Sequence, residues 1–541
     1  MTVEAWIYPE GPGSGGSAGS GGAIVNKEGE FEIARFENGY IGWAFANYSP
    51  GWIWVQTTAY TPLNQWSHIA VVYDIYEVRT YLNGIWQHSY PVAGILGDVA
   101  PAYNDLWISG RQTVPGGQIF DGKMDEVRIW SLARTEAEIR QEMHREVPAP
   151  SSAIGLIANY SFNLADGTKA YDYSINLYNG TLVNMDPSTD WEVSTAPIPY
   201  NTIANGNWQS AATWNTGQNA PVNAWSRVQV DHSVSLNSPM EAIDVTISSS
   251  GILTVNQAQS LTVTGDLVNE NSVSGLVLKS GTTGTATIIE NDGAAASVER
   301  YFTGNCIDWH LISAPVSNAQ SGVFAGKYLQ WFDEASNQYI EIVPTTIGLI
   351  PAQGYAVYGT SANNKVTFTG NLNAGSLSIP VTNSATAPYG WNLAGNPFAS
   401  SLDWNSVIPT LSNIGNTIYY LEASTGNWLT WNGTTGSGSR YIPPMQGFFV
   451  SATSNSTLNI PDYVRTHTGS GTFYKDQVSG LVVIKASGNG FEDKAYIHFS
   501  DAATADFDPE ADGYKILSEI NPLLPQLYTT ALGKNLSINT L

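Results

Sequence analysis

The stretch Phe120–Ile139 constrains the fold of this chain more than any other. Its first half, up to Trp130, places apolar side chains at nearly alternate positions, a pattern that predicts a strand. Thr135 then precedes Glu138 by three residues. This spacing is a capping box, which predicts that a short helix begins directly after the strand.

Composition extends the prediction of strands to the whole chain. Only 13% of the 541 residues are charged, whereas about 25% is typical of soluble domains. Glycine (52 residues), Ser, Thr and Asn are plentiful, and the apolar content of 43% is sufficient for packed cores. We therefore predict an all-β, multidomain chain of short strands and turns, with roughly three or four domains.

The net charge of −24, from 46 acidic and 22 basic residues, argues against nucleic acid and anionic membranes as partners. It leaves many carboxylates for calcium. The sequence has no run of about 18 apolar residues, so it predicts no transmembrane segment. Its single cysteine, Cys306, permits no internal disulfide.

Four segments together carry a family resemblance: Thr2–Pro9, Trp66–Tyr73, Tyr81–Gly84 and Phe120–Trp130. They resemble the laminin-G-like, concanavalin-A-like jelly-roll domains of bacterial surface proteins. The resemblance implies a β-sandwich over residues 1–198 that acts as a binding module. It also implies that Met1 lies inside this domain. At the other end of the chain, Leu536–Leu541 stops within a strand-like pattern, so we expect a C-terminal extension.

Three further domains are predicted. Residues 199–298 contain Gly-bounded strands about 10–15 residues apart, which indicate a small β-solenoid or β-stack, with a β-sandwich as the alternative. Residues 299–470 contain two similar segments, Asp308–Pro315 and Gly390–Pro397, which indicate an internally duplicated β-sandwich. Residues 471–541 form a truncated C-terminal β module.

The later domains also resemble known modules. Gly390–Pro397, Ser401–Trp404 and Ile442–Val450 are similar to a module of Bacteroidetes proteins exported by the type IX secretion route. The resemblance implies that residues 471–541 precede an absent sorting domain. It also implies an extracellular protein on the cell surface.

Aromatic side chains are the candidates for sugar binding, because a pyranose ring offers a face of C–H bonds that stacks on Trp or Tyr. Trp43, Tyr48, Trp52 and Trp54 crowd one short segment. Trp52 follows Pro50-Gly51 and is the best candidate for a loop tip, where function is common. The alternative for these residues is a place in the sandwich core.

Calcium needs six to eight oxygen ligands, which carboxylate-rich loops supply. In the first domain the candidate calcium ligands are Asp74, Asp105, Asp121 and Asp125. A second possible calcium loop contains Asp501, Asp506, Asp508, Glu510 and Asp512. The alternatives are a structural carboxylate at Asp125 and a solvated C-terminal loop.

No catalytic residues are predicted. Glycoside hydrolysis needs two carboxylates about 5–9.5 Å apart. The pattern Glu-x-Asp-x-x-Glu of the catalytic jelly rolls is missing from the sequence. Asp125 and Glu126 are adjacent, so strict alternation would put them on opposite faces of the strand.

These observations predict an adhesin or carbohydrate-binding protein that is not an enzyme. Its expected ligand is a glycan or a surface protein, held at the rim of the jelly roll, and its expected cofactor is calcium. Two alternatives stay open. One is a structural or filament-forming surface protein that self-associates through β-edges. The other is the non-catalytic part of a secreted polysaccharide-degrading enzyme; a glycoside hydrolase is the remaining enzymatic reading.

Overall fold

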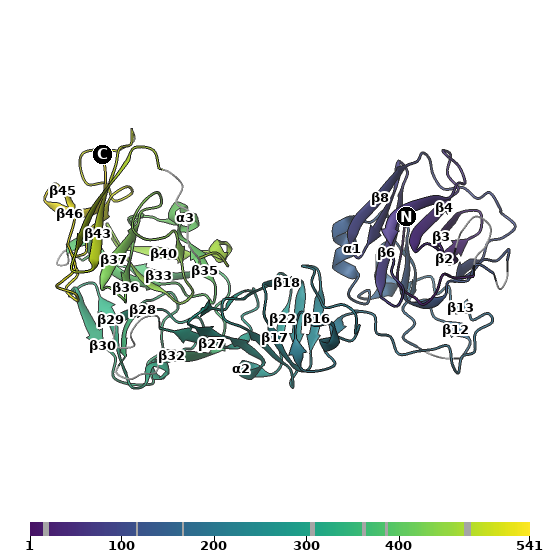
Figure 1. Cartoon of the computed structure of the whole chain (residues 1–541), viewed down its shortest axis with the longest axis horizontal. Helices are drawn as coiled ribbons and strands as arrows, with labels where there is room; N and C mark the ends of the chain where they lie inside the picture. Colours follow the sequence, from purple (N-terminus) through teal and green to yellow (C-terminus); the bar gives the residue numbers. More distant parts are fainter. Residues whose placement is uncertain are drawn as a thin grey trace. The chain divides into compact units, whose positions relative to one another are not determined.

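The computed structural model describes residues 1–14, 21–114, 117–164, 167–302, 309–359, 364–384, 388–469, 478–501 and 503–541. It is built almost entirely of strands, which confirms the all-β prediction (Figure 1). It forms two compact units: Met1–Ile203, Ser210–Pro221 and Trp225–Val228 make the first, and Ala204–Gln209, Val222–Ala224 and Gln229–Leu541 the second. The finer division into four domains stays a prediction.

The first unit is a β-sandwich of two antiparallel sheets (Figure 1). The six-stranded sheet has the order β11 (Leu156–Tyr160), β10 (Gly122–Trp130), β1 (Thr2–Pro9), β6 (Ser67–Asp74), β7 (Glu77–Leu82) and β8 (Ile85–Pro91). The five-stranded sheet has the order β5 (Val55–Tyr60), β4 (Tyr40–Phe45), β3 (Phe31–Arg35), β2 (Gly22–Lys27) and β9 (Leu106–Ile108). A two-stranded ribbon, β12 (Lys169–Ala170) and β13 (Gly180–Thr181), accompanies them.

The core lies between these two sheets and follows from side-chain alternation. In β5, Val55, Thr57 and Ala59 are buried and the residues between them are exposed. Ile7, Val25, Ile33 and Trp43 belong to the same core cluster. The predicted sandwich is therefore confirmed at the level of fold.

The predicted strand and helix at residues 120–139 are both present. α1 (Glu136–Glu142) begins with the Thr135–Glu138 capping box. It covers the outer face of the six-stranded sheet, where Trp6 Nε1 donates a hydrogen bond of 2.7 Å to Met143 O. Trp130 Nε1 also donates to the buried Glu4 carboxylate, at 2.8 Å.

The two long sides of the sandwich differ. On one side the edge strands β5 and β8 meet, and Thr58 Oγ1 donates to Gln87 O at 2.6 Å. On the other side the edge strands are β9 and β11. Both line a cleft, which is described below.

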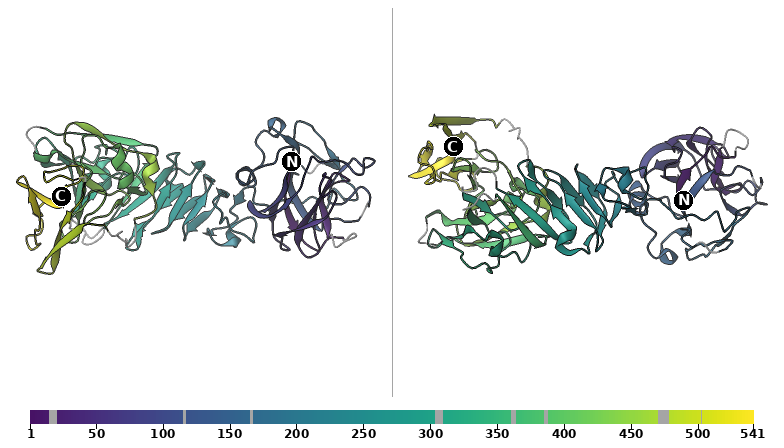
Figure 2. Two further views of the ribbon diagram at one scale, coloured as in Figure 1. Left: turned by 90° about the horizontal axis from the view of Figure 1, so that it is seen from above. Right: turned by 60° about the horizontal axis from the view of Figure 1, so that its bottom comes forward.

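Parallel strands stack at the start of the second unit, as a β-solenoid requires (Figure 2). β15 (Gly206–Asn207), β17 (Ser233–Leu236), β20 (Ile252–Val255), β23 (Leu276–Leu278) and β27 (Ala295–Tyr301) follow one another in one sheet. β18 (Met240–Ala242), β21 (Ser260–Val263) and β26 (Thr287–Ile289) form a second sheet, and β19 (Asp244–Ile247) pairs with β22 (Leu267–Asn269).

Side chains in this stack repeat from one coil to the next. Val234, Leu253 and Leu276 are paired in register and buried. At a neighbouring turn, Asn237 Nδ2 donates to Asn207 Oδ1 at 2.9 Å, and Asn256 donates to Asn237. This parallel stacking favours the solenoid over the sandwich alternative. β27 continues past residue 298 and pairs antiparallel with β32 (Lys365–Asn371).

Two four-stranded sheets follow and share one strand order. In the first repeat β28 (Trp309–Ile312), β31 (Tyr355–Gly359), β29 (Lys327–Asp333) and β30 (Gln338–Glu341) lie side by side. In the second repeat the corresponding order is β34 (Trp391–Gly395), β39 (Gly447–Ser451), β36 (Ile418–Glu422) and β37 (Asn427–Trp431). β27 with β32, and β33 (Leu377–Val381) with β40 (Ser456–Ile460), flank them as antiparallel pairs. The duplication expected from the two similar segments therefore has a structural counterpart, from Trp309 onward.

Shorter elements complete the second repeat. β35 (Ser401–Asp403) lies between β38 (Tyr441–Ile442) and β41 (Arg465–Thr466). α3 (Trp404–Val407) begins directly after β35 and is capped by the Asp403 side chain.

The C-terminal sheet has the order β42 (Leu481–Gly488), β43 (Phe491–His498), β46 (Lys534–Thr540) and β44 (Gly513–Tyr514), with β45 (Thr529–Ala531) also paired to β46. It packs on the second repeat, where Tyr514 N donates to Tyr419 Oη at 2.8 Å. β42 lies at its edge.

Candidate functional site

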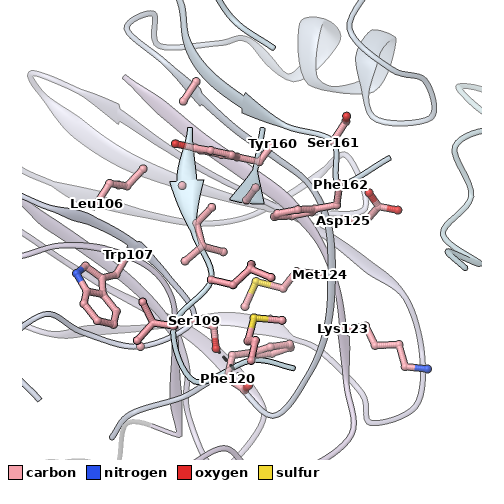
Figure 3. A pocket seen from close by; sticks show the side chains of 18 of the residues that line it. Leu106, Trp107, Ser109, Phe120, Lys123, Met124, Asp125, Tyr160, Ser161 and Phe162 are labelled. Carbon is pink, nitrogen blue, oxygen red and sulfur yellow. Dashed lines mark hydrogen bonds between the residues drawn. The ribbon is translucent and has the colours of Figure 1, made fainter. Parts of the chain in front are cut away.

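The open side of the sandwich holds a cleft with a volume of about 1810 Å³ (Figure 3). Strands β9, β10 and β11 line it, together with the segment 178–195. The cleft exists because β9 and β11 do not meet as β5 and β8 do on the other side. Its floor is therefore continuous with the sandwich core.

The floor of the cleft is apolar. Phe120, Met124 and Phe162 lie close together in Figure 3, with Leu106 and Trp107 toward the other wall. Three rings follow one another along the cleft, from Tyr160 through Phe162 to Trp191. The ring centroids are 6.4 Å apart for the first pair and 6.2 Å for the second. Phe162 and Trp191 are half-buried, so part of each ring remains accessible.

The entrance of the cleft is polar. Lys123 forms ion pairs with Glu192 and, at 3.6 Å, with Glu10. The hydrogen bond to Glu192 raises the pKa of Lys123, and its ammonium group stays charged. Asn163, Asn179 and Asn184 add amide groups to the lining. A ligand in this cleft would contact apolar rings at the floor and hydrogen-bonding groups at the entrance.

Asp172 organises one wall of the cleft. Its side chain is 2% exposed and accepts hydrogen bonds of 2.8 Å from the backbone amides of Asn159, Ser174 and Tyr178. The Ser174 hydroxyl also donates to it at 2.8 Å. Tyr160 Oη in turn donates to Tyr178 O at 2.6 Å. The carboxylate thus fixes the turn 172–178 against β11.

The four aromatic candidates lie in different environments. Trp43 is 1% exposed and belongs to the core, so its prediction as a ligand residue is wrong; it points inward from β4, between the two sheets. Trp54 is half-buried and its ring lies 5.7 Å from that of Phe36. Trp52 is half-buried in a loop, whereas Tyr48 is 89% exposed.

Tyr48 lies where loops meet at one end of the sandwich. Its backbone amide donates to Ala93 O at 3.1 Å, and Val92 N donates to Tyr76 O at 2.9 Å. The two hydrogen bonds connect the loop of Tyr48 with that of Tyr76, which is 74% exposed. We call this end of the sandwich, with the loop of Tyr48 and Trp52, the rim; it is separate from the residues that line the cleft.

The four carboxylates expected to bind calcium in the first domain do not form one cluster. Asp74 lies 3.7 Å from Arg79, and Asp105 accepts a hydrogen bond from Gln112. Asp121 is exposed, and Asp125 is buried and bonded to the Ser194 hydroxyl. Across the residues that the structure describes, no three His, Cys, Asp or Glu side chains are grouped to hold a metal ion.

The C-terminal acidic loop is held partly by its own carboxylates. Asp512 is 2% exposed and accepts from Asp508 N at 2.8 Å and from Thr540 N at 2.7 Å. Asp508 accepts from Glu510 N at 2.9 Å. Asp501 and Asp506 are exposed. Asp508 and Asp512 therefore stabilise the turn, and calcium binding stays a prediction.

Asp125 and Glu126 do not obey strict alternation, because a β-bulge between β1 and β10 interrupts the register there. Asp125 accepts from Ser194, and Glu126 lies 2.8 Å from Arg128. Burial raises the pKa of both carboxyl groups. Each carboxylate is held by a structural partner; Asp125 also lines the cleft described above, whereas Glu126 is not among the residues that line it.

The cleft itself was not predicted from the sequence. The signal for it is weak, because Tyr160 and Phe162 read as strand residues and Trp191 lies in a segment without periodicity. Only the structure shows that β9 and β11 leave one side of the sandwich open. Cys306 lies outside the described residues.

Comparison with known families supports the sandwich. Residues 1–140 match the concanavalin A-like lectin/glucanases superfamily, so the N-terminal domain is concanavalin A-like. Residues 199–427 match a family described as a domain of unknown function. Among curated proteins no sequence matches the chain. Where the structure is described, no helix is long and apolar enough to cross a membrane.

Three solved structures are similar to part of the chain. A proposed carbohydrate-binding protein from Bacteroides ovatus is 26% identical over 33% of this chain and 50% of its own, with a TM-score of 0.27. A pentraxin from Limulus polyphemus is 17% identical over 26% and 67%, with a TM-score of 0.20. Domain 4 of an extracellular arabinanase from Geobacillus stearothermophilus, bound to arabinotriose, is 22% identical over 26% and 63%, with a TM-score of 0.19. The chain spans half the length of the first of these, and none of the three locates a site here.

Proposed function

We propose that the concanavalin A-like domain binds carbohydrate in the cleft between β9 and β11, without catalysis, and that the chain works outside the cell. The neighbouring half-buried rings of Phe162 and Trp191 are the observation that carries the proposal, and the ring of the buried Tyr160 lies next to that of Phe162. Accessible aromatic faces stack on the C–H face of a pyranose, and the amides at the entrance suit its hydroxyl groups. The match of residues 1–140 to the concanavalin A-like lectin/glucanases superfamily supports the same ligand class.

The absence of catalysis belongs to the proposal. The two carboxylates nearest to one another on β10, Asp125 and Glu126, are engaged by Ser194 and Arg128. A retaining or inverting hydrolase needs one carboxyl as acid and a second as nucleophile or base across the same bond. Here the carboxylates at the entrance, Glu10 and Glu192, are paired with Lys123.

Affinity electrophoresis of the full chain through gels that contain soluble polysaccharides tests this function. We expect at least one polysaccharide to retard the wild-type chain, and Trp191→Ala to weaken that retardation about tenfold. Loss of one stacking ring is worth about 1 kcal/mol or more. An assay for new reducing ends in the same samples should detect none.

Trp86→Ala is the matched control, because Trp86 is 53% exposed on β8, on the closed side of the sandwich. It should bind as the wild type does. Tyr48→Ala and Trp52→Ala test the rim instead. Retardation that depends on the rim variants and not on Trp191 would move the site to the rim, and released reducing ends would make the protein an enzyme.

Calcium is a second part of the proposal that needs its own test. Titration of calcium into chelator-treated chain by calorimetry should give a binding heat, as the net charge of −24 and the carboxylate-rich loops lead us to expect. The same glycan gels run with calcium and with chelator show whether the ion assists binding. Absence of heat and equal retardation would remove calcium from the proposal.

One observation favours a second function, assembly into a surface structure. β42 is an edge strand, and its consecutive residues Val482, Val483 and Ile484 are 46%, 46% and 43% exposed. Long apolar edge strands pair with other chains unless they are blocked. Sedimentation velocity of the wild type and of Val483→Lys tests this: assembly requires larger species that the substitution abolishes, and a monomer at all concentrations excludes it.

A further inference from the structure

Three aromatic side chains form a cluster on the sheet of the first repeat, in the second compact unit. The ring centroids of Trp309 and Tyr358 are 5.2 Å apart, and those of Tyr328 and Tyr358 are 6.1 Å apart. Tyr358 is paired in register with both of the other residues, so the three side chains share one face of the sheet. Tyr328 is 51% exposed, and Trp309 and Tyr358 are half-buried.

The second repeat provides an internal comparison. Leu311 pairs with Ala356 in the first repeat, and Leu393 pairs with Phe449 in the second. This register makes Trp391 the counterpart of Trp309, two residues before the leucine in each case.

The surroundings of Trp391 explain why an aromatic residue occurs there. Its ring lies 4.8 Å from that of Tyr419 and 5.7 Å from that of Tyr514, which belongs to the C-terminal sheet. In the second repeat, burial under this sheet accounts for the tryptophan.

Burial does not account for the aromatic residue at position 328, because Tyr328 is 51% exposed. Its counterpart is Thr417, whose hydroxyl donates to Asp512 O in the C-terminal sheet at 2.8 Å. Gln330 is the counterpart of Tyr419, whose hydroxyl accepts from Tyr514 N. The groups that attach the C-terminal sheet to the second repeat are therefore replaced in the first by an exposed ring and an amide.

We infer that Trp309, Tyr328 and Tyr358 form a second carbohydrate-binding platform, in the compact unit that does not contain the cleft. The three neighbouring rings can stack on successive faces of a sugar chain. Gln330 lies two residues after Tyr328 on the same face, and Glu341 is its cross-strand neighbour. Both are hydrogen-bonding groups for sugar hydroxyls. The platform does not depend on the cleft proposed above.

The charge beside the platform favours a hydroxylated ligand over an apolar protein surface. Glu341 is exposed and is the cross-strand neighbour of Gln330, on the same face as Tyr328. An apolar partner would have to desolvate this carboxylate without replacing its water contacts. A sugar chain can keep it hydrated or bond to it through hydroxyl groups.

The test uses the full chain in four forms on the same polysaccharide gels: wild type, Trp191→Ala, Tyr328→Ala and the double variant. We expect at least one polysaccharide to retard Trp191→Ala, and Tyr328→Ala to weaken that remaining retardation about three- to tenfold. Tyr328→Phe keeps the ring and should bind as wild type. Glu341→Gln removes an exposed carboxylate but no ring, so it should weaken binding by a smaller factor.

Tyr463→Ala is the matched control, because Tyr463 is 71% exposed in the same unit and, among the described residues, belongs to no such cluster of rings. Complete loss of binding in Trp191→Ala alone would overturn the platform and leave the cleft standing. Equal retardation of Tyr328→Ala and wild type would also overturn it. If no polysaccharide retards the wild type, both sites are rejected.

Discussion

Gln353 and Gln446 hold equivalent positions in the two repeats, and each forms a β-bridge to the other repeat. Gln353 bridges to Ala394, and Gln446 bridges to Ile312, the counterpart of Ala394. The backbone bonds around them correspond as well: Gly395 N donates to Ala352 O at 2.8 Å, and Ser313 N donates to Met445 O at 2.9 Å. The two repeats therefore form one pseudo-symmetric body, and neither repeat completes its backbone hydrogen bonds alone.

Substitution of Gln446 should destabilise this body. Gln446 Nε2 donates to Leu311 O at 3.0 Å, and Arg300 donates to its Oε1 at 3.3 Å. Gln446→Ala leaves both partners without that bond, at a cost of about 1–3 kcal/mol. Urea unfolding measures the change. Gln338→Ala on the exposed strand β30 is the control and should leave the midpoint unchanged.

Substitution of Asp172 should lower the stability of the sandwich more than substitution of its exposed aspartates. Asp172→Ala leaves three backbone amides without their acceptor, which predicts a loss of about 2–5 kcal/mol. Urea unfolding of the first unit reports the loss, and the affinity gels report whether the cleft survives. Asp121→Ala, at an exposed carboxylate, is the control. Equal effects of the two substitutions would contradict the role of Asp172.

The fold was predictable where local signals and burial agree. The capping box at Thr135, the alternation in β5 and the two similar segments of the repeats each act through neighbours in sequence, and the structure has a helix, a strand and a duplication there. A second repeated motif, Pro351–Val357 and Pro444–Val450, was equally visible in the sequence and identifies β31 with β39.

The candidate site was less predictable than the fold, because the exposure of an aromatic side chain depends on what the rest of the fold places against it. Trp43 and Tyr48 are five residues apart and equally aromatic, yet one is 1% and the other 89% exposed. Trp43 lies in β4 and points at the facing sheet, whereas Tyr48 lies in the loop after β4. The cleft depends on the gap between two edge strands that are about 50 residues apart in sequence, β9 and β11, and no local pattern reports such a gap.

The buried Glu32 should make the first unit less stable as the pH rises. Its side chain is 1% exposed, on β3 and 3.5 Å from Arg111, and burial raises its pKa from 4.5 to about 7. The unfolded chain ionises this group near pH 4.5 and the folded chain near pH 7. Stability should therefore fall between these values and then level off, by about 3 kcal/mol at about 1.4 kcal/mol per pKa unit.

Glu32→Gln removes the ionisation and should remove this part of the pH dependence. Calorimetric unfolding of the full chain between pH 4.5 and 8 measures it, through the transition of the first unit. Glu37→Gln, at an exposed position in the same unit, should keep the wild-type slope. A slope that Glu32→Gln does not change would show that the carboxylate is satisfied in its charged form.

His467 should make the second unit less stable as the pH falls, which is the opposite of the effect of Glu32 on the first unit. Its Nε2 and Nδ1 each lie 2.8 Å from a threonine hydroxyl, of Thr262 and Thr287, so the imidazole joins the segment after β41 to the solenoid. Burial lowers its pKa from 6.5 to about 4. The unfolded chain binds a proton near pH 6.5, and the folded chain resists it until about pH 4. The stabilisation is therefore present above pH 6.5 and is lost as the pH falls toward 4, by about 3 kcal/mol.

Substitution separates this effect from general acid denaturation. His467→Gln cannot take up a proton, so its second-unit transition should change less between pH 7 and 4.5 than that of the wild type, although the variant is less stable at pH 7 because one ring hydrogen bond is lost. His498→Gln, in the same unit, should keep the wild-type acid response. If His467→Gln and the wild type lose stability in parallel, protonation of His467 does not release the segment, and the acid response must come from carboxyl groups whose pKa is lower in the folded than in the unfolded chain.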